Sequence, residues 1–149
     1  MKNRLILMLL SALGFAGCGE WVNTGVAEYG TPTGYFSVKG TVSDEAGNPI
    51  PNIKAGMGNH PGDVYHSQVT DENGVFVFDK HRSWPDEKQW LSFRDDDGEA
   101  NGGEFETAEI EVVFTKTGGG DGNWVQGYYE APDIAVTLVR KAEAPQEQE

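Results

Sequence analysis

The stretch of this chain that most constrains its fold is residues 35–78, where short alternating runs are separated by turn-forming clusters. Within residues 36–42, every second position is apolar or glycine, and the positions between them are polar. Successive side chains of a strand point to opposite faces, so this period of two predicts a half-buried strand. Further strands are predicted at residues 50–55, 64–70 and 75–78, with a loop at 56–62.

Two turn clusters separate these runs. Residues 43–49 read SDEAGNP, and residues 71–74 read DENG. Their Asp, Asn, Gly and Pro residues supply side-chain-capped turns, positive φ angles and a fixed φ. Asn73-Gly74 lies between two extended runs and is a strong hairpin signal, so we expect residues 64–70 and 75–78 to form a hairpin.

The rest of the chain continues the pattern of short strands and polar connections. Strands are predicted at 90–93, 105–115 and 134–139, and 124–129 is either a short strand or irregular. Polar loops are predicted at 79–88 and 95–104, and a flexible connection at 117–122. About seven strands at this spacing predict an all-β sandwich rather than a barrel or an α/β fold.

The organising stretch also carries a resemblance. Residues 40–53 (GTVSDEAGNPIPNI) followed by residues 70–76 (TDENGVF) resemble the carboxypeptidase regulatory-like domain. That resemblance implies a single Ig-like, transthyretin-like β-sandwich of about seven strands. It implies no particular activity, because a fold of this kind serves many functions.

The N-terminus has the three parts of a secretory signal peptide. A basic head at residues 1–4 precedes an apolar core at 5–13, which is too short to span a bilayer, and small residues lead to Cys18. Cys18 is the only cysteine in the chain, and its position matches a bacterial lipoprotein box. We therefore predict cleavage after Gly17 and lipidation of Cys18 with palmitate-type chains, rather than an incidental buried thiol.

This reading divides the chain into parts and gives it a location. The lipoprotein signal peptide is residues 1–17, the tether 18–34, the β-sandwich 35–140 and a disordered tail 141–149. A lipid on Cys18 predicts a protein of the cell envelope that is anchored to the outer membrane. The sequence does not indicate whether the protein is on the periplasmic or the surface side of that membrane.

Charge restricts the partners. The net charge is −13, and removal of the signal peptide takes away Lys2 and Arg4, so the mature chain is still more acidic. Such a chain repels phosphate backbones, and nucleic acid is therefore not an expected partner. Acidic residues added for solubility also account for this charge.

A second resemblance covers most of the chain. Its components are the lipoprotein start, EYGTP at residues 28–32, KGTVSDEAGNPI at 39–50 and DDDGEANGGEF at 95–105, in that order. This combination is similar to a family of small lipoproteins of Bacteroidetes that are encoded beside radical SAM enzymes. The resemblance implies a radical SAM enzyme as a partner, with this chain as an associated lipoprotein or a substrate of that enzyme.

The loop at 95–104 holds the densest cluster of oxygen ligands. Calcium takes six to eight oxygens, and an acidic loop interrupted by glycine can surround it. The candidate ligands are Asp95, Asp97, Glu99, Asn101 and Glu104. Consecutive Asp residues depart from the EF-hand spacing, and a solvated acidic turn between two strands is the alternative.

Aromatic residues in predicted loops suggest a second kind of site. Trp84, Trp124 and Tyr128 could stack on a glycan or a peptide, which makes a glycan- or peptide-binding module the alternative to a general binding or structural role. Packing in a small core is the competing explanation for these residues.

No catalytic residue is predicted. His60, His66 and His81 lack zinc-ligand spacing and are expected to lie on the surface. The glutamates at 104, 106, 109 and 111 are expected to line a solvated strand face. The sequence therefore favours a protein that is not an enzyme.

Overall fold

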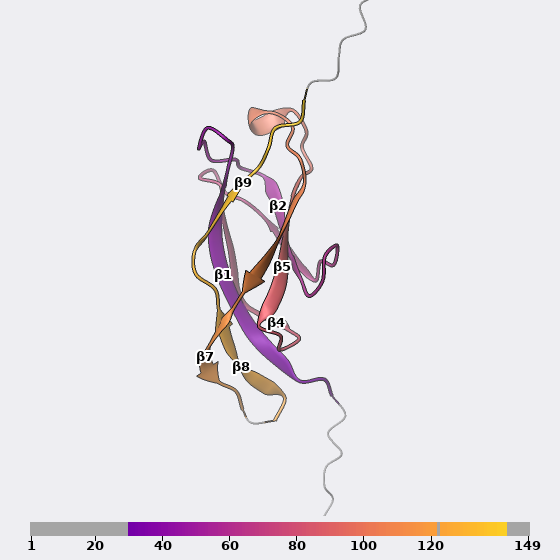
Figure 1. The fold of residues 1–149 in the computed structure, drawn as a ribbon, viewed down its shortest axis with the longest axis vertical. Helices are drawn as coiled ribbons and strands as arrows, with labels where there is room; N and C mark the ends of the chain where they lie inside the picture. Colours follow the sequence, from indigo (N-terminus) through magenta and orange to yellow (C-terminus); the bar gives the residue numbers. More distant parts are fainter. Residues whose placement is uncertain (1–29, 122, 143–149) are drawn as a thin grey trace, which may run out of the picture. The chain divides into compact units, whose positions relative to one another are not determined.

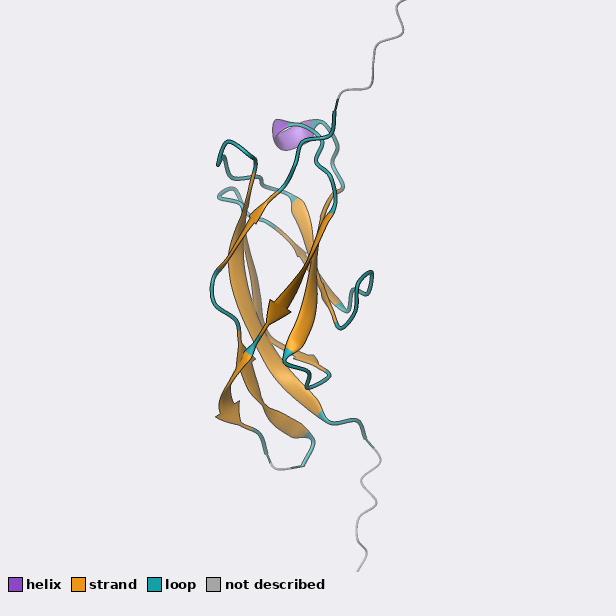
Figure 2. Cartoon of the chain, in the orientation of Figure 1, coloured by secondary structure: helices purple, strands orange, loops and turns teal. Residues whose placement is uncertain are grey.

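A computed structural model of the chain describes residues 30–121 and 123–142. The predicted signal peptide, Cys18, most of the tether and the tail from residue 143 lie outside the described residues. The described part is all-β, as predicted, and contains a single short 3-10 helix (Figure 2). The strands are β1 (Thr33–Ser43), β2 (Ile53–Gly58), β3 (His66–Val69), β4 (Val75–Ser83), β5 (Lys88–Asp95), β6 (Ala108–Val113), β7 (Thr115–Gly119), β8 (Val125–Glu130) and β9 (Ile134–Thr137).

The first sheet, sheet A, is organised around β1. Strand β4 pairs antiparallel along one edge of β1, while β8 and β9 share the other edge, and β7 pairs outside β8. Both of the shared pairings are parallel: β8 covers β1 from Thr33 to Ser37, and β9 covers it from Gly40 to Ser43. Figure 1 shows β9 and β8 beside the two halves of β1.

The second sheet, sheet B, has the order β3-β2-β5-β6, and all its pairings are antiparallel. The chain passes between the sheets at Phe114, which is buried and separates β6 from β7. Its backbone N–H donates to the carbonyl of Glu87 at 2.7 Å. The sequence predicted one strand over residues 105–115, and the structure divides it because β6 and β7 belong to different sheets.

The core lies between the two sheets and is rich in phenylalanine. Phe36 contacts Tyr129 with ring centroids 4.8 Å apart, and Phe76 meets Phe93 across the core at 5.2 Å. The fully buried large apolar residues are Phe36, Phe76, Phe78, Phe93, Phe114, Ile53, Met57, Leu91, Leu138 and Val42. Burial of the inward face of each strand is the main source of stability in such a sandwich, since apolar burial is worth roughly 25 cal/mol per Å².

The predicted hairpin of residues 64–70 and 75–78 is wrong. The turn itself forms, with Gly74 at a φ of 68° and its N–H donating to Asp71 O at 2.9 Å. However, β3 pairs with β2 in sheet B, whereas β4 pairs with β1 in sheet A. The turn therefore connects the two sheets: β4 contributes Phe76 and Phe78 to the core from sheet A, whereas β3 is an edge strand of sheet B.

Three predicted loop boundaries also need correction. Strand β2 continues to Gly58, into the predicted loop at 56–62, and β4 continues to Ser83, into the predicted loop at 79–88. Strand β7 occupies part of the predicted flexible connection at 117–122. Neighbouring strands supply the backbone hydrogen bonds that make these polar and glycine-rich segments regular. Within the described residues, no helix has the length and hydrophobicity that a membrane span requires.

A candidate ligand-binding recess on sheet B

The candidate site lies on the outer face of sheet B, where small residues from neighbouring strands line up. Gly56 of β2 is in register with Ser67 of β3 on one side and with Ser92 of β5 on the other. Ser92 is in turn in register with Glu109 of β6. Register partners carry their side chains on the same face of the sheet. This row of small residues therefore forms the floor of a depression between longer side chains.

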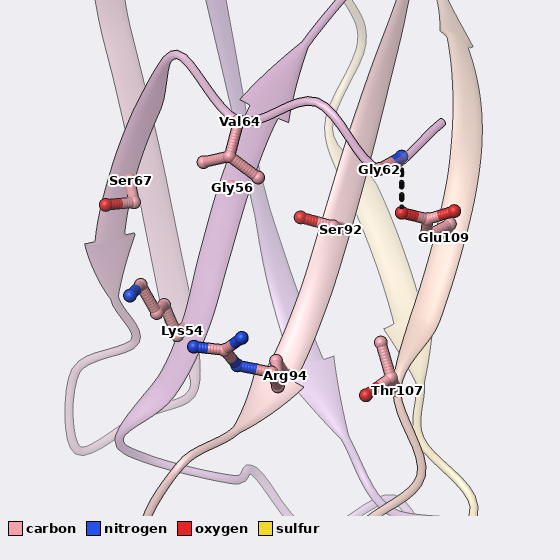
Figure 3. Close-up of a pocket in the computed structure, with 9 residues that line it drawn as sticks. All are labelled: Lys54, Gly56, Gly62, Val64, Ser67, Ser92, Arg94, Thr107 and Glu109. Carbon is pink, nitrogen blue, oxygen red and sulfur yellow. Dashed lines mark hydrogen bonds between the residues drawn. The ribbon is translucent and has the colours of Figure 1, made fainter. Parts of the chain in front are cut away.

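A recess of about 460 Å³ occupies this floor, and Figure 3 shows the side chains around it. The nine residues that line it are Lys54, Gly56, Gly62, Val64, Ser67, Ser92, Arg94, Thr107 and Glu109. Pockets that bind small molecules have volumes of roughly 300–1,000 Å³, so a compact ligand such as one or two sugar rings fits.

The connection between β2 and β3 forms one wall of the recess. Val64 lies over Gly56 (Figure 3), and a Cβ at position 56 would be 2.9 Å from Val64 Cγ2 and 2.6 Å from Ser92 Oγ. At position 58, a Cβ would be 2.0 Å from the carbonyl oxygen of Asp63. Both glycines are therefore required by the close approach of this connection to the sheet.

Glu109, on the edge strand β6, holds the same connection from the opposite edge of the recess. Its Oε1 accepts a hydrogen bond from the backbone N–H of Gly62 at 2.9 Å (Figure 3). At the other end, the N–H of Tyr65 donates to Met57 O at 2.9 Å. The wall of the recess is thus tied to β6 and to β2.

The charges at one end of the recess are largely balanced. Arg94 Nη2 donates to Asp96 Oδ2 at 3.1 Å, and Lys54 Nζ lies 3.8 Å from the same carboxylate. The hydrogen bond from Arg94, with the positive charges of Arg94 and Lys54, holds the pKa of Asp96 below its ordinary value. Asp96 therefore stays ionised and neutralises this end of the recess at physiological pH.

Three hydroxyl groups in the recess are free for a ligand. Ser67, Ser92 and Thr107 make no side-chain hydrogen bond to any residue that the structure describes. A hydroxyl can donate one hydrogen bond and accept two, and the Lys54 ammonium adds donors. The recess is therefore suited to a compact ligand that is rich in hydroxyl or amide groups.

The predicted calcium loop has a different arrangement from the one expected. Asp95 Oδ1 accepts from the N–H groups of Asp97 and Gly98 at 3.1 and 3.2 Å, and its Oδ2 accepts from Phe105 N–H at 3.0 Å. Glu104 Oε1 pairs with Lys141 Nζ at 2.6 Å. These oxygens organise the loop and its contact with the C-terminal segment.

No group of three or more His, Cys, Asp or Glu residues suited to a metal is found within the described chain. Glu99 is exposed, and the side chain of Asn101 lies outside what the structure describes. Calcium binding by the loop stays a prediction, and the arrangement of Asp95 and Glu104 does not favour it.

The predicted aromatic residues lie close to one end of β1. Ser83, directly before Trp84, is in register with Gly34, and the carbonyl of Trp124 accepts from Thr33 N–H at 2.8 Å. The side chain of Trp84 is 50% exposed, while Trp124 is half-buried. Tyr128 is exposed on the outer face of sheet A, opposite the recess.

The three histidines were expected to lie on the surface, and two of them are only partly exposed. His66 of β3 and His81 of β4 are half-buried, and their ring centroids lie 4.2 Å apart. They meet where the edges of the two sheets approach each other, and His81 also contacts Phe78. They lie on consecutive strands that belong to different sheets, and no spacing in the sequence indicates their contact. His60 is exposed, as predicted.

The predicted glutamate face is only partly formed. Glu109 and Glu111 lie on the outer face of β6, where Glu111 pairs with Lys88 at 2.7 Å. Glu104 and Glu106 precede the strand.

Sequence reasoning missed the recess. Lys54, Gly56 and Gly58 alternate with buried residues, and extending the strand through Gly58 would have placed all three on one outer face. The row across β3, β2, β5 and β6 depends on strand pairing, which the sequence did not indicate.

Comparison with known proteins leaves the family open. No protein-family model matches the chain, and no curated protein matches it. The resemblances to the carboxypeptidase regulatory-like domain and to radical SAM-associated lipoproteins therefore stay predictions.

Solved structures provide distant likenesses of fold. One is 3-chlorocatechol 1,2-dioxygenase from Rhodococcus opacus 1CP, with a TM-score of 0.46, 12% identity, and coverage of 77% of this chain and 62% of that chain. Another is BcpA, the major pilin subunit of Bacillus cereus, with a TM-score of 0.41, 15% identity, and coverage of 74% and 31%. This chain thus spans less than two thirds of either protein, and neither activity is transferred to it.

Proposed function

We propose that this chain is a lipid-anchored binding protein of the cell envelope, whose β-sandwich holds a short neutral glycan segment in the recess on sheet B. The observation that carries the proposal is the low row of Ser67, Gly56 and Ser92 beneath the Val64 wall. The recess of about 460 Å³ beside this wall has room for one or two sugar rings, and its free hydroxyl groups match their hydroxyls.

A neutral ligand fits better than an anionic one. Asp96 already engages both Arg94 and Lys54, so an anion would have to compete with an internal carboxylate. The carboxylate of Glu109 at the other side would also repel an anion. A peptide is the second occupant to be tested, since amide groups use the same hydrogen-bonding partners.

Binding rather than catalysis is supported by the composition of the recess. Of its nine described lining residues, Glu109 is the one carboxylate, and none is a histidine or cysteine. Glu109 accepts a hydrogen bond from Gly62, which gives it a role in holding the wall. General acid–base chemistry on a glycoside uses two carboxyl groups, and the lining supplies one.

The anchor is proposed from the sequence, with Cys18 as the lipidated residue. The test is an intact-mass spectrum of the protein purified from its native membrane. We expect loss of residues 1–17 and a lipid mass on Cys18, and we expect Cys18→Ala to release the protein from the membrane fraction. An unlipidated mature chain would contradict the anchor. A further covalent mass shift would instead support the predicted role as a substrate of a radical SAM enzyme.

The recess is tested by calorimetric titration of the full mature chain with neutral oligosaccharides and with capped tripeptides. We expect a neutral oligosaccharide to bind, and we expect Ser92→Val to weaken it by at least about fivefold, because one hydroxyl is lost and the floor is raised. Thr41→Val, at an exposed position on the outer face of β1, is the matched control and should leave binding unchanged.

Two results would overturn the glycan proposal. One is the absence of oligosaccharide binding in the wild-type chain. The other is binding of oligosaccharide that Ser92→Val leaves unchanged. Binding of the tripeptides alone, with the same sensitivity to Ser92→Val, would assign the recess to peptides.

A further inference from the structure

A second row of residues crosses the outer face of sheet A, on the opposite side of the sandwich from the recess. Tyr35 of β1 is in register with Arg82 of β4 and with Tyr128 of β8. Tyr128 is in register with Gly118 of β7. Four neighbouring strands therefore present a guanidinium, two tyrosine rings and a position without a side chain.

The two tyrosines form a shared aromatic surface. Their ring centroids are 5.5 Å apart and the planes differ by 18°. Tyr128 is 42% exposed and Tyr35 is half-buried. A Cβ at position 118 would be 3.2 Å from Tyr128 Cδ2, so the glycine of β7 keeps this side of the ring uncovered at its register position. An exposed pair of nearly parallel rings provides an apolar surface with polar hydroxyl tips.

Arg82 stands beside this surface without an acidic partner. Its Nε donates to Thr33 Oγ1 at 2.8 Å, which directs the side chain along β1. The terminal Nη1 and Nη2 groups have no partner among the described residues. Those two nitrogens form the planar fork that binds a carboxylate in a bidentate manner.

Arg82 is one of the few basic residues of the described chain that form no ion pair. The basic residues that form ion pairs in the described chain are Lys39, Lys54, Lys88, Arg94, Arg140 and Lys141. Lys80, Arg82 and Lys116 form none within the described chain, and all three belong to β4 or β7. Lys116 is in register with the buried Tyr129 and therefore does not share the outer face, so Arg82 is the unpaired cation beside the tyrosine pair. A guanidinium without an acidic partner beside an aromatic surface favours an anionic partner there.

We propose that this row, Arg82–Tyr35–Tyr128, is a binding site for a carboxylate-bearing sugar of an acidic glycan. The apolar C–H face of the sugar ring stacks on the tyrosines, and its carboxylate is held by the fork of Arg82. The site is independent of the recess on sheet B, which takes a neutral ligand and uses different strands.

The next row of the sheet sets the orientation of the sugar. Ser37 is in register with Glu130, and the Ser37 hydroxyl donates to Asp79 Oδ1 at 3.3 Å. The carboxylates of Glu130 and Asp79 repel a third carboxylate, whereas the hydrogen bond to Thr33 directs the Arg82 side chain away from them. The sugar carboxylate therefore lies on the Thr33 side of the tyrosine pair, away from Asp79 and Glu130.

The test is calorimetric titration of the full mature chain with trigalacturonate and triglucuronate, with trigalactose and triglutamate as comparisons. We expect at least one acidic trisaccharide to bind at least about fivefold more tightly than trigalactose or triglutamate. Tyr128→Ala should weaken it by at least about fivefold, and Tyr128→Phe should retain it. Arg82→Gln should remove the preference for the acidic sugar, and Arg82→Lys should keep part of it.

Matched controls away from sheet A are Tyr65→Ala, which removes another exposed tyrosine, and Lys88→Gln, which makes the same change of charge. Both should bind as the wild-type chain does. The proposal is overturned if neither acidic trisaccharide binds, if trigalactose or triglutamate binds equally well, or if Tyr128→Ala has no effect. Loss of acidic-sugar binding in Ser92→Val instead would assign that ligand to the recess.

Discussion

The side chain of Glu109 on β6 accepts a hydrogen bond from the backbone N–H of Gly62 at 2.9 Å, although 47 residues separate them in the chain. This contact joins the edge of sheet B to the connection between β2 and β3. That connection is the wall of the recess, so the shape of the candidate site depends on a residue outside its own segment.

The first prediction tests this contact. Glu109→Ala removes the acceptor, and we expect the amide hydrogen of Gly62 to exchange roughly fivefold faster, as the loss of about 1 kcal/mol of local stability implies. Glu109→Gln keeps an oxygen acceptor and should retain most of the protection. Glu111→Ala, two residues along the same strand, is the control. Equal exchange at Gly62 in wild type and Glu109→Ala would show that the contact is not formed in solution.

The second prediction concerns Thr70, which is buried at the end of the β3 segment. Its Oγ1 accepts from Ile53 N–H at 3.0 Å and donates to Ile50 O at 2.8 Å. Thr70→Val keeps the shape but leaves both backbone groups without these partners, so the free energy of unfolding should fall by about 2 kcal/mol. Urea denaturation measures it. The exposed control Thr41→Val should change it by less than about 0.5 kcal/mol, and a similar small change in Thr70→Val would contradict the prediction.

The third prediction concerns pH and the pair of His66 and His81. Burial, followed by the neighbouring His66, lowers the pKa of His81 from its ordinary value of 6.5, against an opposing effect of Asp79. The neutral ring is therefore favoured in the folded chain. Its contribution to stability is fully present above pH 6.5 and is lost as the pH falls through the lowered pKa.

The measurement is the unfolding midpoint in urea between pH 7.5 and 4.5. His81→Phe retains an aromatic ring beside Phe78 and should reduce the loss of stability on acidification. His60→Phe, at an exposed position, should leave the pH dependence as in the wild type. An unchanged profile in His81→Phe would exclude the histidine pair as its source.

The fourth prediction concerns the turn after β1. Asp44 Oδ1 accepts from the N–H groups of Ala46 and Asn48 at 2.9 and 2.8 Å, and Oδ2 accepts from the Asn48 side chain. The side-chain and backbone hydrogen bonds from Asn48 lower the pKa of Asp44 from 3.8. The stabilisation is therefore present above pH 3.8 and is lost as the pH falls below it.

We expect Asp44→Ala to lower the urea midpoint at pH 6 and to have a smaller effect at pH 3, because below pH 3.8 the unfolded chain takes up protons and part of the stabilisation is lost. Asp133→Ala removes an exposed carboxylate that pairs with Lys39, and it should change the midpoint less at pH 6. An effect of Asp44→Ala that is as large at pH 3 as at pH 6 would mean that the charge of the turn is unimportant.

The turns were among the features most readily predicted from sequence. Asp71 and Asp121 each accept from the N–H groups two and four residues later, as Asp44 does. This geometry needs only an Asp followed by residues that tolerate a tight turn, so local sequence is sufficient to specify it. Local sequence did not indicate which strands the turns would join. The turn at Gly74 was expected to close a hairpin, and it connects the two sheets instead.

By itself, the sequence determined the all-β class, the sandwich architecture and most of the inward-facing residues, because alternation along a strand decides which side chains face the core. Tertiary structure alone decided where the candidate binding surfaces lie. The recess row and the Arg82–Tyr35–Tyr128 row each cross several strands, and the two histidines meet across two sheets. Register between strands distant in sequence comes from the packing of the whole core, so no local pattern encodes it.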